Sequence, residues 1–143
     1  MASQVFPIND ISNLIPQKSP FVMVDSLLDF SGNSVVSSFK ILENNLFVEN
    51  DYLLEPGLIE NMAQTVALHT GYDFFVKGEV PPTGYIGSIK KVEIFNLPFL
   101  NDTITTKANI LHEFNGVTMV SIQVFDSDDK EIASGEMKTV IAN

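Results

Sequence analysis

The sequence predicts an α+β fold in which a curled antiparallel sheet wraps around one long helix. Two observations support this prediction. Residues 57 to about 76 carry apolar residues at helical spacing, and the runs around them are β-rich and joined by short turns. Antiparallel strands in short connections leave one sheet face for the helix to cover. The helix is unusually apolar for a surface element, so we expect it to lie inside the curl of the sheet.

The part of the chain before the helix is expected to supply one or two helical turns and a hairpin. A capping Asn or Asp precedes a short apolar pattern within residues 9–16, which a proline closes. Residues 21–30 and 34–41 are β-rich and are separated by a Ser-Gly-Asn sequence, which favours a hairpin. Residues 42–56 have no clean period, and no element is predicted there.

The helical segment of residues 57–76 would be about 30 Å long at 1.5 Å per residue. Glu60, Gln64 and Thr65 lie off its apolar stripe, which consists of Ile59, Met62, Ala63, Val66 and Ala67. After it come strand candidates at residues 84–96, 102–113, 117–126 and 131–141, with turn formers between them. A hairpin, a long enclosed helix and a meander describe a hot-dog fold, which we expect to form one domain over residues 1–143.

The composition excludes several classes of function. The 143 residues include 18 acidic and 8 basic residues, every basic residue is a lysine, and there is no cysteine. Without arginine and with a net charge of −10, nucleic-acid binding is not expected. No apolar run approaches the ~20 residues that span a bilayer, and residues 1–6 do not resemble a secretory signal. We therefore expect a soluble, cytoplasmic protein with no membrane partner.

Three segments resemble the FabZ-type 3-hydroxyacyl-acyl-carrier-protein dehydratases. The family's opening pattern, L-P-H-x-x-P-F-x-x-V-D, is similar to residues 15–25, and its helix motif E-x-M-A-Q is matched by residues 60–64. The family's strand after the helix carries glycine and paired basic residues, and residues 84–92 resemble it. The resemblance covers almost the whole chain in the right order, and it implies a hot-dog fold.

Two departures from the family's pattern concern histidine. The segment before the helix, residues 45–57, lacks the G-H-F-P-G motif that carries the family's usual base. In this respect the chain looks more like the dehydratase-like branch found with aryl-polyene and flexirubin pigment synthesis. That branch keeps the histidine of the opening pattern, which Gln17 replaces here.

Glu60 is the residue that the resemblance marks as catalytic. Dehydration of a 3-hydroxyacyl thioester needs a base for the α-proton and an acid for the departing hydroxyl group. Glu60 is expected near the first helical turn, where unpaired backbone N–H groups favour negative charge. Gln64 lies one turn further on the same face, and we expect its amide to bond either the carboxylate or the substrate.

The other site predictions follow from the matching segments. Substrate contacts are expected from Gln17, Gly57, Gln64, Gly87 and Ser88. Lys90 and Lys91 alternate across a strand, so only one of them is expected to face a given side. These lysines belong either to a solvated edge or to a carrier-binding surface that contacts the phosphate of a pantetheine arm.

The two histidines are not assigned to the site. His69 follows Glu60 on the helix at a spacing that points it about 180° away, so we interpret it as structural. His112 lies beside Glu113 in a strand candidate, and a catalytic role would need a contact that the sequence does not reveal. No metal-ligand spacing, phosphate loop or serine-hydrolase motif is present. We expect no metal and no cofactor, with the substrate carried on phosphopantetheine.

Three functions are compatible with these features. The first is a dehydratase acting on 3-hydroxyacyl groups attached to an acyl carrier protein. The second is a non-catalytic subunit that pairs with an active homologue, because sites in this family lie between protomers. The third is an acyl-thioesterase of the same fold. We expect a homodimer or heterodimer, since the curled sheet leaves an edge that hot-dog proteins cover by pairing.

Overall fold

The structure, a computed structural model, describes residues 6–141 and contains one helix and eight strands over that range. Six strands form an antiparallel sheet in the order β1-β2-β6-β7-β8-β5, and β3 and β4 form a small hairpin. The elements are β1 (Ser26–Ser31), β2 (Ser34–Lys40), β3 (Val48–Glu49), β4 (Tyr52–Leu53), α1 (Glu55–Val76), β5 (Gly84–Ile94), β6 (Thr103–Phe114), β7 (Val117–Phe125) and β8 (Glu131–Ile141). The prediction that residues 1–6 are not a secretory signal concerns a segment whose residues 1–5 lie outside the described residues.

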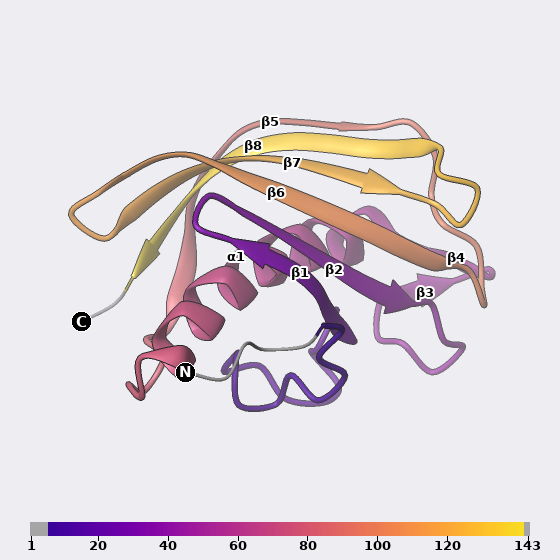
Figure 1. Cartoon of the computed structure of the whole chain (residues 1–143). Helices are drawn as coiled ribbons and strands as arrows, with labels where there is room; N and C mark the ends of the chain where they lie inside the picture. The colour runs from indigo at the N-terminus through magenta and orange to yellow at the C-terminus, as the bar shows by residue number, and fades with distance from the viewer. Residues whose placement is uncertain (1–5, 142–143) are drawn as a thin grey trace.

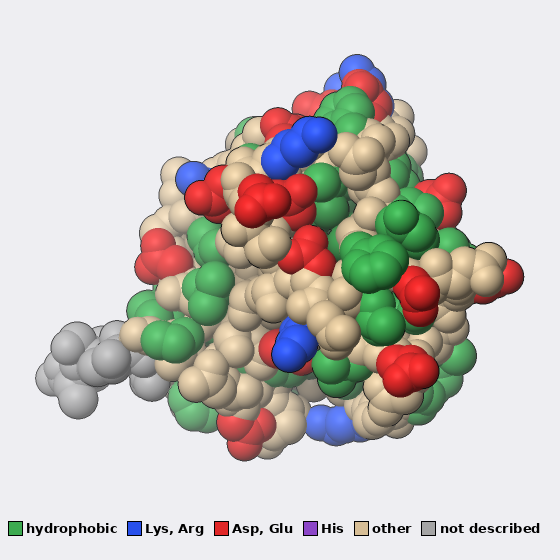
Figure 2. All heavy atoms as spheres, turned by 90° about the vertical axis from the view of Figure 1, so that its right-hand side faces the viewer, with side chains coloured by type: hydrophobic (Ala, Val, Ile, Leu, Met, Phe, Trp, Pro, Cys, Tyr) green, Lys and Arg blue, Asp and Glu red, His purple; other side chains and the backbone are tan. Residues whose placement is uncertain are grey.

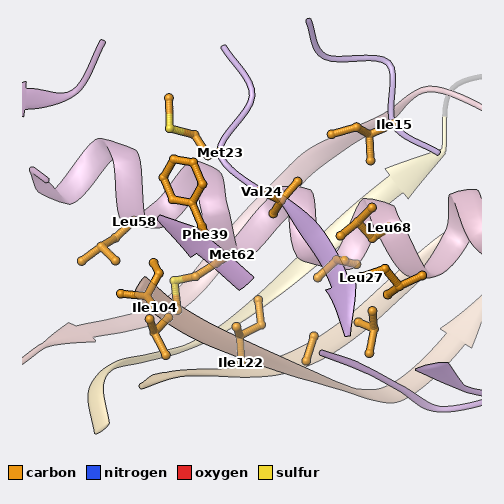
Figure 3. Packing of buried hydrophobic residues seen from close by; sticks show 14 of the residues in the cluster. Ile15, Met23, Val24, Leu27, Phe39, Leu58, Met62, Leu68, Ile104 and Ile122 are labelled. Atoms are coloured by element: carbon orange, nitrogen blue, oxygen red, sulfur yellow. The ribbon is translucent and has the colours of Figure 1, made fainter. Parts of the chain in front are cut away.

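The sheet curls around α1, which lies on its concave side (Figure 1). Leu58, Met62 and Leu68 of the helix are fully buried in the same core as Ile104 and Ile122 of the sheet (Figure 3). Burial of each such side chain contributes about 1.5–3 kcal/mol to folding. The enclosed helix and its antiparallel sheet confirm the predicted α+β hot-dog architecture.

The buried side of α1 is wider than the apolar stripe that the sequence indicates. Gln64 and Thr65 lie off that stripe, yet they are buried together with Asn61. The Thr65 hydroxyl donates to the Asn61 carbonyl (2.7 Å) and accepts from the Ser37 hydroxyl of β2 (2.7 Å). The Thr106 hydroxyl of β6 donates to Asn61 Oδ1 (2.6 Å). A core tolerates polar groups that have partners, and these partners come from strands far away in the sequence.

The segments before α1 differ most from the prediction. Residues 42–56, where no element is predicted, contain the β3–β4 hairpin, whose turn residues Asn50 and Asp51 have positive φ. The helix begins at Glu55, two residues earlier than predicted, with a proline in its first turn, where a backbone N–H is not required. Residues 9–16 contain one hydrogen-bonded turn in place of a helix.

The strands after α1 end within two residues of the predicted bounds. Asn115 and Gly116 join β6 to β7, and both have positive φ (51° and 77°), as a tight hairpin turn requires. β5 is an edge strand of the sheet. Its register against β8 shifts at Gly87 and at Lys90, which marks two bulges.

The surface around β3 and β4 carries both acidic and hydrophobic side chains. Figure 2 faces this side of the molecule and shows acidic side chains spread over it, with hydrophobic side chains between them. Lysines lie singly among the described residues of this face and form no basic patch there. No helix within residues 6–141 combines the length and the apolar character needed to cross a membrane.

Candidate active site

A cavity of about 290 Å³ extends along one side of α1. It lies between the helix, residues 14–17, the start of β5 and the end of β8. Apolar residues form much of its wall, while Glu60 and Gln17 bring an acidic and an amide side chain to it. A mostly apolar, concave space with a few polar groups is the usual form of a small-molecule site.

Glu60 is half-buried at the wall of this cavity. Because α1 begins at Glu55, Glu60 lies in the second turn of the helix and not in the first turn as predicted. Its Oε2 atom accepts a hydrogen bond from Gln64 Nε2 (3.0 Å). Its Oε1 atom has no hydrogen-bond partner within residues 6–141, so one carboxylate oxygen is held and the other is available to a ligand.

The Gln64 side chain is bonded to other groups of the protein and does not line the cavity. Its side chain is 1% exposed. Besides the bond to Glu60, Nε2 donates to the Phe21 carbonyl (2.9 Å), and Oε1 accepts from the Met23 backbone N–H (2.6 Å). Both amide hydrogens are therefore used. Of the two expected contacts, the bond to the Glu60 carboxylate is present, and the contact with the substrate stays a prediction.

Asn61 also attaches the opening segment, residues 15–25, to the helix. Its Nδ2 atom donates to the Met23 carbonyl (2.7 Å), while Gln64 holds the Met23 N–H. These two amides bind the Phe21 carbonyl and both backbone groups of Met23 in place of a strand partner. β1 begins at Ser26 and not at residue 21 as predicted. The two motifs of the sequence, residues 15–25 and 60–64, thus bind one another.

Gln17 reaches the cavity because the opening segment is held in this way. It lines the same cavity as Glu60, although the two residues are far apart in the sequence. Its Oε1 atom is buried and has no hydrogen-bond partner among the described residues. Most buried acceptors in folded proteins have a partner, so this oxygen is an exception that calls for an explanation.

Three other predicted substrate-binding residues do not line the cavity either. Gly57 packs against β4, where an added Cβ would lie 2.5 Å from Leu53 Cδ1, so close packing explains the glycine. Gly87 is exposed at a bulge, where an added Cβ would lie 2.7 Å from Val140 Cγ2. Ser88 is exposed beside it. Close packing thus explains the two glycines, and the expected substrate contacts of all three residues stay predictions.

Lys90 and Lys91 are both exposed, and both have acidic partners. Lys90 Nζ lies 3.7 Å from Glu136 Oε2, and Lys91 Nζ lies 2.8 Å from Glu93 Oε1. Glu136 is the residue opposite Lys91, so the bulge lets both lysines reach one side, and the predicted strict alternation is wrong here. The hydrogen bond that Lys91 donates to the Glu93 carboxylate raises the pKa of Lys91. Neither lysine lines the cavity.

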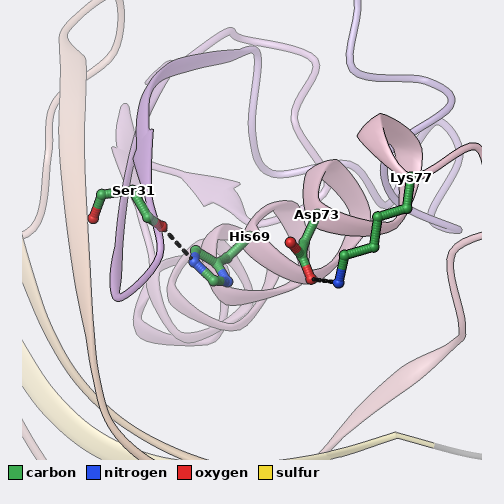
Figure 4. Close-up of polar contacts among 4 residues, drawn as sticks. All are labelled: Ser31, His69, Asp73 and Lys77. Atoms are coloured by element: carbon green, nitrogen blue, oxygen red, sulfur yellow. Dashed lines mark hydrogen bonds and ion pairs between the residues drawn. The ribbon is translucent and has the colours of Figure 1, made fainter. Parts of the chain in front are cut away.

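His69 is structural, as its spacing predicts. Its Nε2 atom lies 2.8 Å from the Ser31 carbonyl (Figure 4), and its ring stacks on Phe30 with centroids 4.6 Å apart. A bond to a carbonyl requires the hydrogen on Nε2. His112 is exposed on β6 and does not line the cavity. No group of three or more His, Asp or Glu side chains within the described range is arranged to hold a metal ion.

The chain is similar along most of its length to known dehydratases. It is 27% identical over 135 residues to the 3-hydroxyacyl-[acyl-carrier-protein] dehydratase FabZ of Ruminiclostridium cellulolyticum, covering 90% of this chain and 92% of that protein. It is 29% identical over 142 residues to FabZ of Clostridium botulinum strain Loch Maree, covering 94% of both.

Solved structures confirm the fold. A chain of the dehydratase heterocomplex ApeI:P from Xenorhabdus doucetiae matches with a TM-score of 0.87 at 16% identity, covering 98% of this chain and 93% of that one. The PaaI protein of E. coli, from the phenylacetic acid degradation operon, matches with a TM-score of 0.65 at 11% identity, covering 82% and 78%. The family model described as ApeP-like, ApeP dehydratase, matches residues 9–143. The chain therefore belongs to the ApeP-like dehydratase family.

Proposed function

We propose that this chain is the glutamate-bearing subunit of a dehydratase that removes water from 3-hydroxyacyl groups carried on an acyl carrier protein. The observation that supports this most directly is the position of Glu60, which is fixed by Gln64 at the wall of a mostly apolar cavity. The names of the FabZ relatives supply the substrate class. The cavity along α1 has the character needed for an acyl chain.

Glu60 is proposed to act on the hydroxyl group of the substrate. In the reaction a base removes the α-proton, the electron pair of that C–H bond forms the double bond, and the C–O bond breaks. The departing oxygen takes a proton from the Glu60 carboxyl group and leaves as water. Gln64 holds Oε2, so the proton would reside on Oε1, the oxygen without a protein partner.

The base is proposed to come from a partner subunit. His69 is bonded to Ser31, and His112 lies outside the cavity, so the described residues bring no histidine to Glu60. One solved structure of similar shape, with a TM-score of 0.87, is a dehydratase heterocomplex. This favours a heterodimer with a related hot-dog subunit over a homodimer.

Pairing at β5 would bring that partner to the site. The outer edge of β5 has no neighbouring strand in the described chain, and Tyr85 and Ile89 on it are 61% and 45% exposed. Gly84, Tyr85 and Ile86 also line the cavity. A subunit that pairs along this edge would therefore stand beside Glu60's cavity. In this proposal the acyl carrier protein is a cytoplasmic partner that contacts Lys90 or Lys91. No metal takes part in the proposed reaction.

The decisive experiment incubates 3-hydroxyacyl-carrier protein with the purified chain, with a co-purified hot-dog partner, and with both together. Mass spectrometry separates loss of water from loss of the acyl group. We expect dehydration only in the mixture. Acyl release would identify a thioesterase instead. If the partner alone dehydrates the substrate fully, and adding this chain or its Glu60→Gln variant changes nothing, this chain is a non-catalytic subunit.

A further inference from the structure

The cavity holds a hydrogen-bond acceptor that the protein itself does not satisfy. Gln17 Oε1 is buried and has no partner among the described residues, and the Gln17 side chain lines the cavity together with Glu60. By contrast, the buried amides of Asn61 and Gln64 on the neighbouring side of α1 are bonded at both ends. An unpaired acceptor in such a cavity indicates a ligand with a donor group.

The backbone on both sides of Gln17 keeps this oxygen at the cavity. Leu14 and Ile15, just before it, are buried in the core. Phe21, shortly after it, is bound through its carbonyl by Gln64. Because the segment is anchored at both ends, a Gln17 side chain at the wall is a property of the fold and not of a loose surface loop.

We infer that Gln17 is a positioning residue that holds the 3-hydroxyl group of the substrate through its amide oxygen. This inference rests on the proposed function. In the acyl part of a 3-hydroxyacyl thioester the hydroxyl group is the only hydrogen-bond donor, since the thioester carbonyl only accepts and the chain is apolar. When the hydroxyl donates to Gln17 Oε1, its lone pairs remain free to receive the proton from Glu60. Gln17 transfers no proton itself.

The test compares two ligands that differ by one hydroxyl group. The purified chain, which is not expected to dehydrate the ligand without its partner, is titrated by calorimetry with a 3-hydroxyacyl-pantetheine thioester and with the saturated acyl-pantetheine thioester of the same length. Amide groups of the pantetheine arm are present in both ligands, so a contact from Gln17 to the arm cannot produce a difference between them. We expect the native protein to bind the hydroxylated ligand about tenfold more tightly, as one hydrogen bond allows.

The Gln17→Met variant keeps the length of the side chain and removes the amide. We expect this variant to lose the tenfold preference because it binds the hydroxylated ligand more weakly and the saturated ligand equally well. Its melting temperature should stay the same or rise, because the substitution removes an unpaired buried acceptor. Gln123→Met, on the outer face of β7 away from the cavity, is the matched control and should keep the preference.

Three results would overturn the inference: equal loss of affinity for both ligands, no change in either, or no preference in the native protein. Each of these is a binding result that needs no turnover. A different result would separate the two proposals. If the chain and its partner do not dehydrate the substrate, but the preference for the hydroxylated ligand still depends on Gln17, the proposed function fails and this inference stands.

Discussion

The two sides of α1 differ in how their polar groups are satisfied. On the side of Asn61 and Thr65, the buried amide and hydroxyl groups are bonded to strands or to the opening segment. On the cavity side, one oxygen of Glu60 is bonded, whereas Gln17 Oε1 at the same cavity has no partner among the described residues. Adjacent residues of one helix thus serve different purposes. Satisfied groups fix the architecture, whereas unsatisfied groups remain for a ligand.

Gln64 connects the two sides. Its amide holds the backbone of Phe21 and Met23 and, with the same nitrogen, one oxygen of Glu60. The contact that closes the opening segment on the helix therefore also orients the proposed catalytic carboxylate. This arrangement gives a physical reason for E and Q to occur together in the E-x-M-A-Q motif.

The largest expected effect belongs to the cavity side. Glu60→Gln keeps the shape of the side chain, and its amide oxygen can still accept from Gln64. The variant loses the proton that the departing hydroxyl needs, so kcat/KM should fall by about 10²-fold or more, equivalent to ~2.7 kcal/mol, in the assay with the partner subunit. The urea midpoint of unfolding should hardly change. Native activity in this variant would refute the assignment of Glu60.

A substitution on the Asn61 side of α1 should have the reverse signature. Asn61→Leu is similar in size but leaves the Met23 carbonyl and the Thr106 hydroxyl without their partner. We expect the free energy of unfolding to fall by about 2 kcal/mol, measured by urea denaturation. Asn109→Leu, at a half-buried position of β6, is the matched control and should stay within about 0.5 kcal/mol of the native protein. If both variants lose the same free energy of unfolding, the buried hydrogen bonds of Asn61 contribute no more to stability than a half-buried side chain does.

A third prediction concerns the volume of the cavity. Ala67 lines the cavity two turns along α1 from Glu60, so Ala67→Leu would fill space where the end of an acyl chain is expected. We expect kcat/KM to fall about tenfold for long acyl chains and little for short ones, since one or two methylene groups in an apolar pocket change binding by this order. A series of acyl-carrier substrates measures this. A uniform fall across the series would mean that the acyl chain does not run along this helix face.

The fold was predictable because its signals are local. Helical spacing marks residues 57–76, and the Asn115-Gly116 turn lies between two runs of alternating residues. The β3–β4 hairpin has only two residues in each strand, which is too short for a period to be seen. The bulges of β5 also have no sequence signal, because they depend on the register against β8.

The site was predictable only where a motif marks it. Glu60 and Gln17 were found through the resemblance, and the structure brings both to one cavity. The bond from Gln64 to Glu60 was one of the two predicted alternatives. The bonds from Gln64 to Phe21 and Met23 were not predictable, because these partners are backbone groups of a segment far away in the sequence. Gly57 was assigned to the substrate, although its small size is explained by contact with Leu53. A glycine in a motif does not by itself distinguish a ligand contact from close packing.

The smallest predicted effect lies in the opening segment itself, at Asp25. Its Oδ2 atom accepts a hydrogen bond from the Lys40 backbone N–H at the end of β2 (2.7 Å). Burial of the carboxyl group raises its pKa above the ordinary value of 3.8, and the bond to Lys40 acts in the opposite direction. Although the residue as a whole is exposed, the carboxylate lies against the protein, so we expect only a modest effect on stability.

The direction of this effect follows from proton linkage. Because the native pKa is raised, the native state binds more protons than the unfolded chain at pH values between 3.8 and the raised value. Stability should therefore decrease through this window as the pH rises, and then stay level with respect to this group. Asp25→Asn keeps an acceptor for Lys40 and cannot ionise. In urea unfolding across this window, the stability of the native protein relative to Asp25→Asn should fall as the pH rises. A relative stability that rises instead would mean that the bond to the Lys40 N–H outweighs burial, and that the charged form of Asp25 anchors the opening segment.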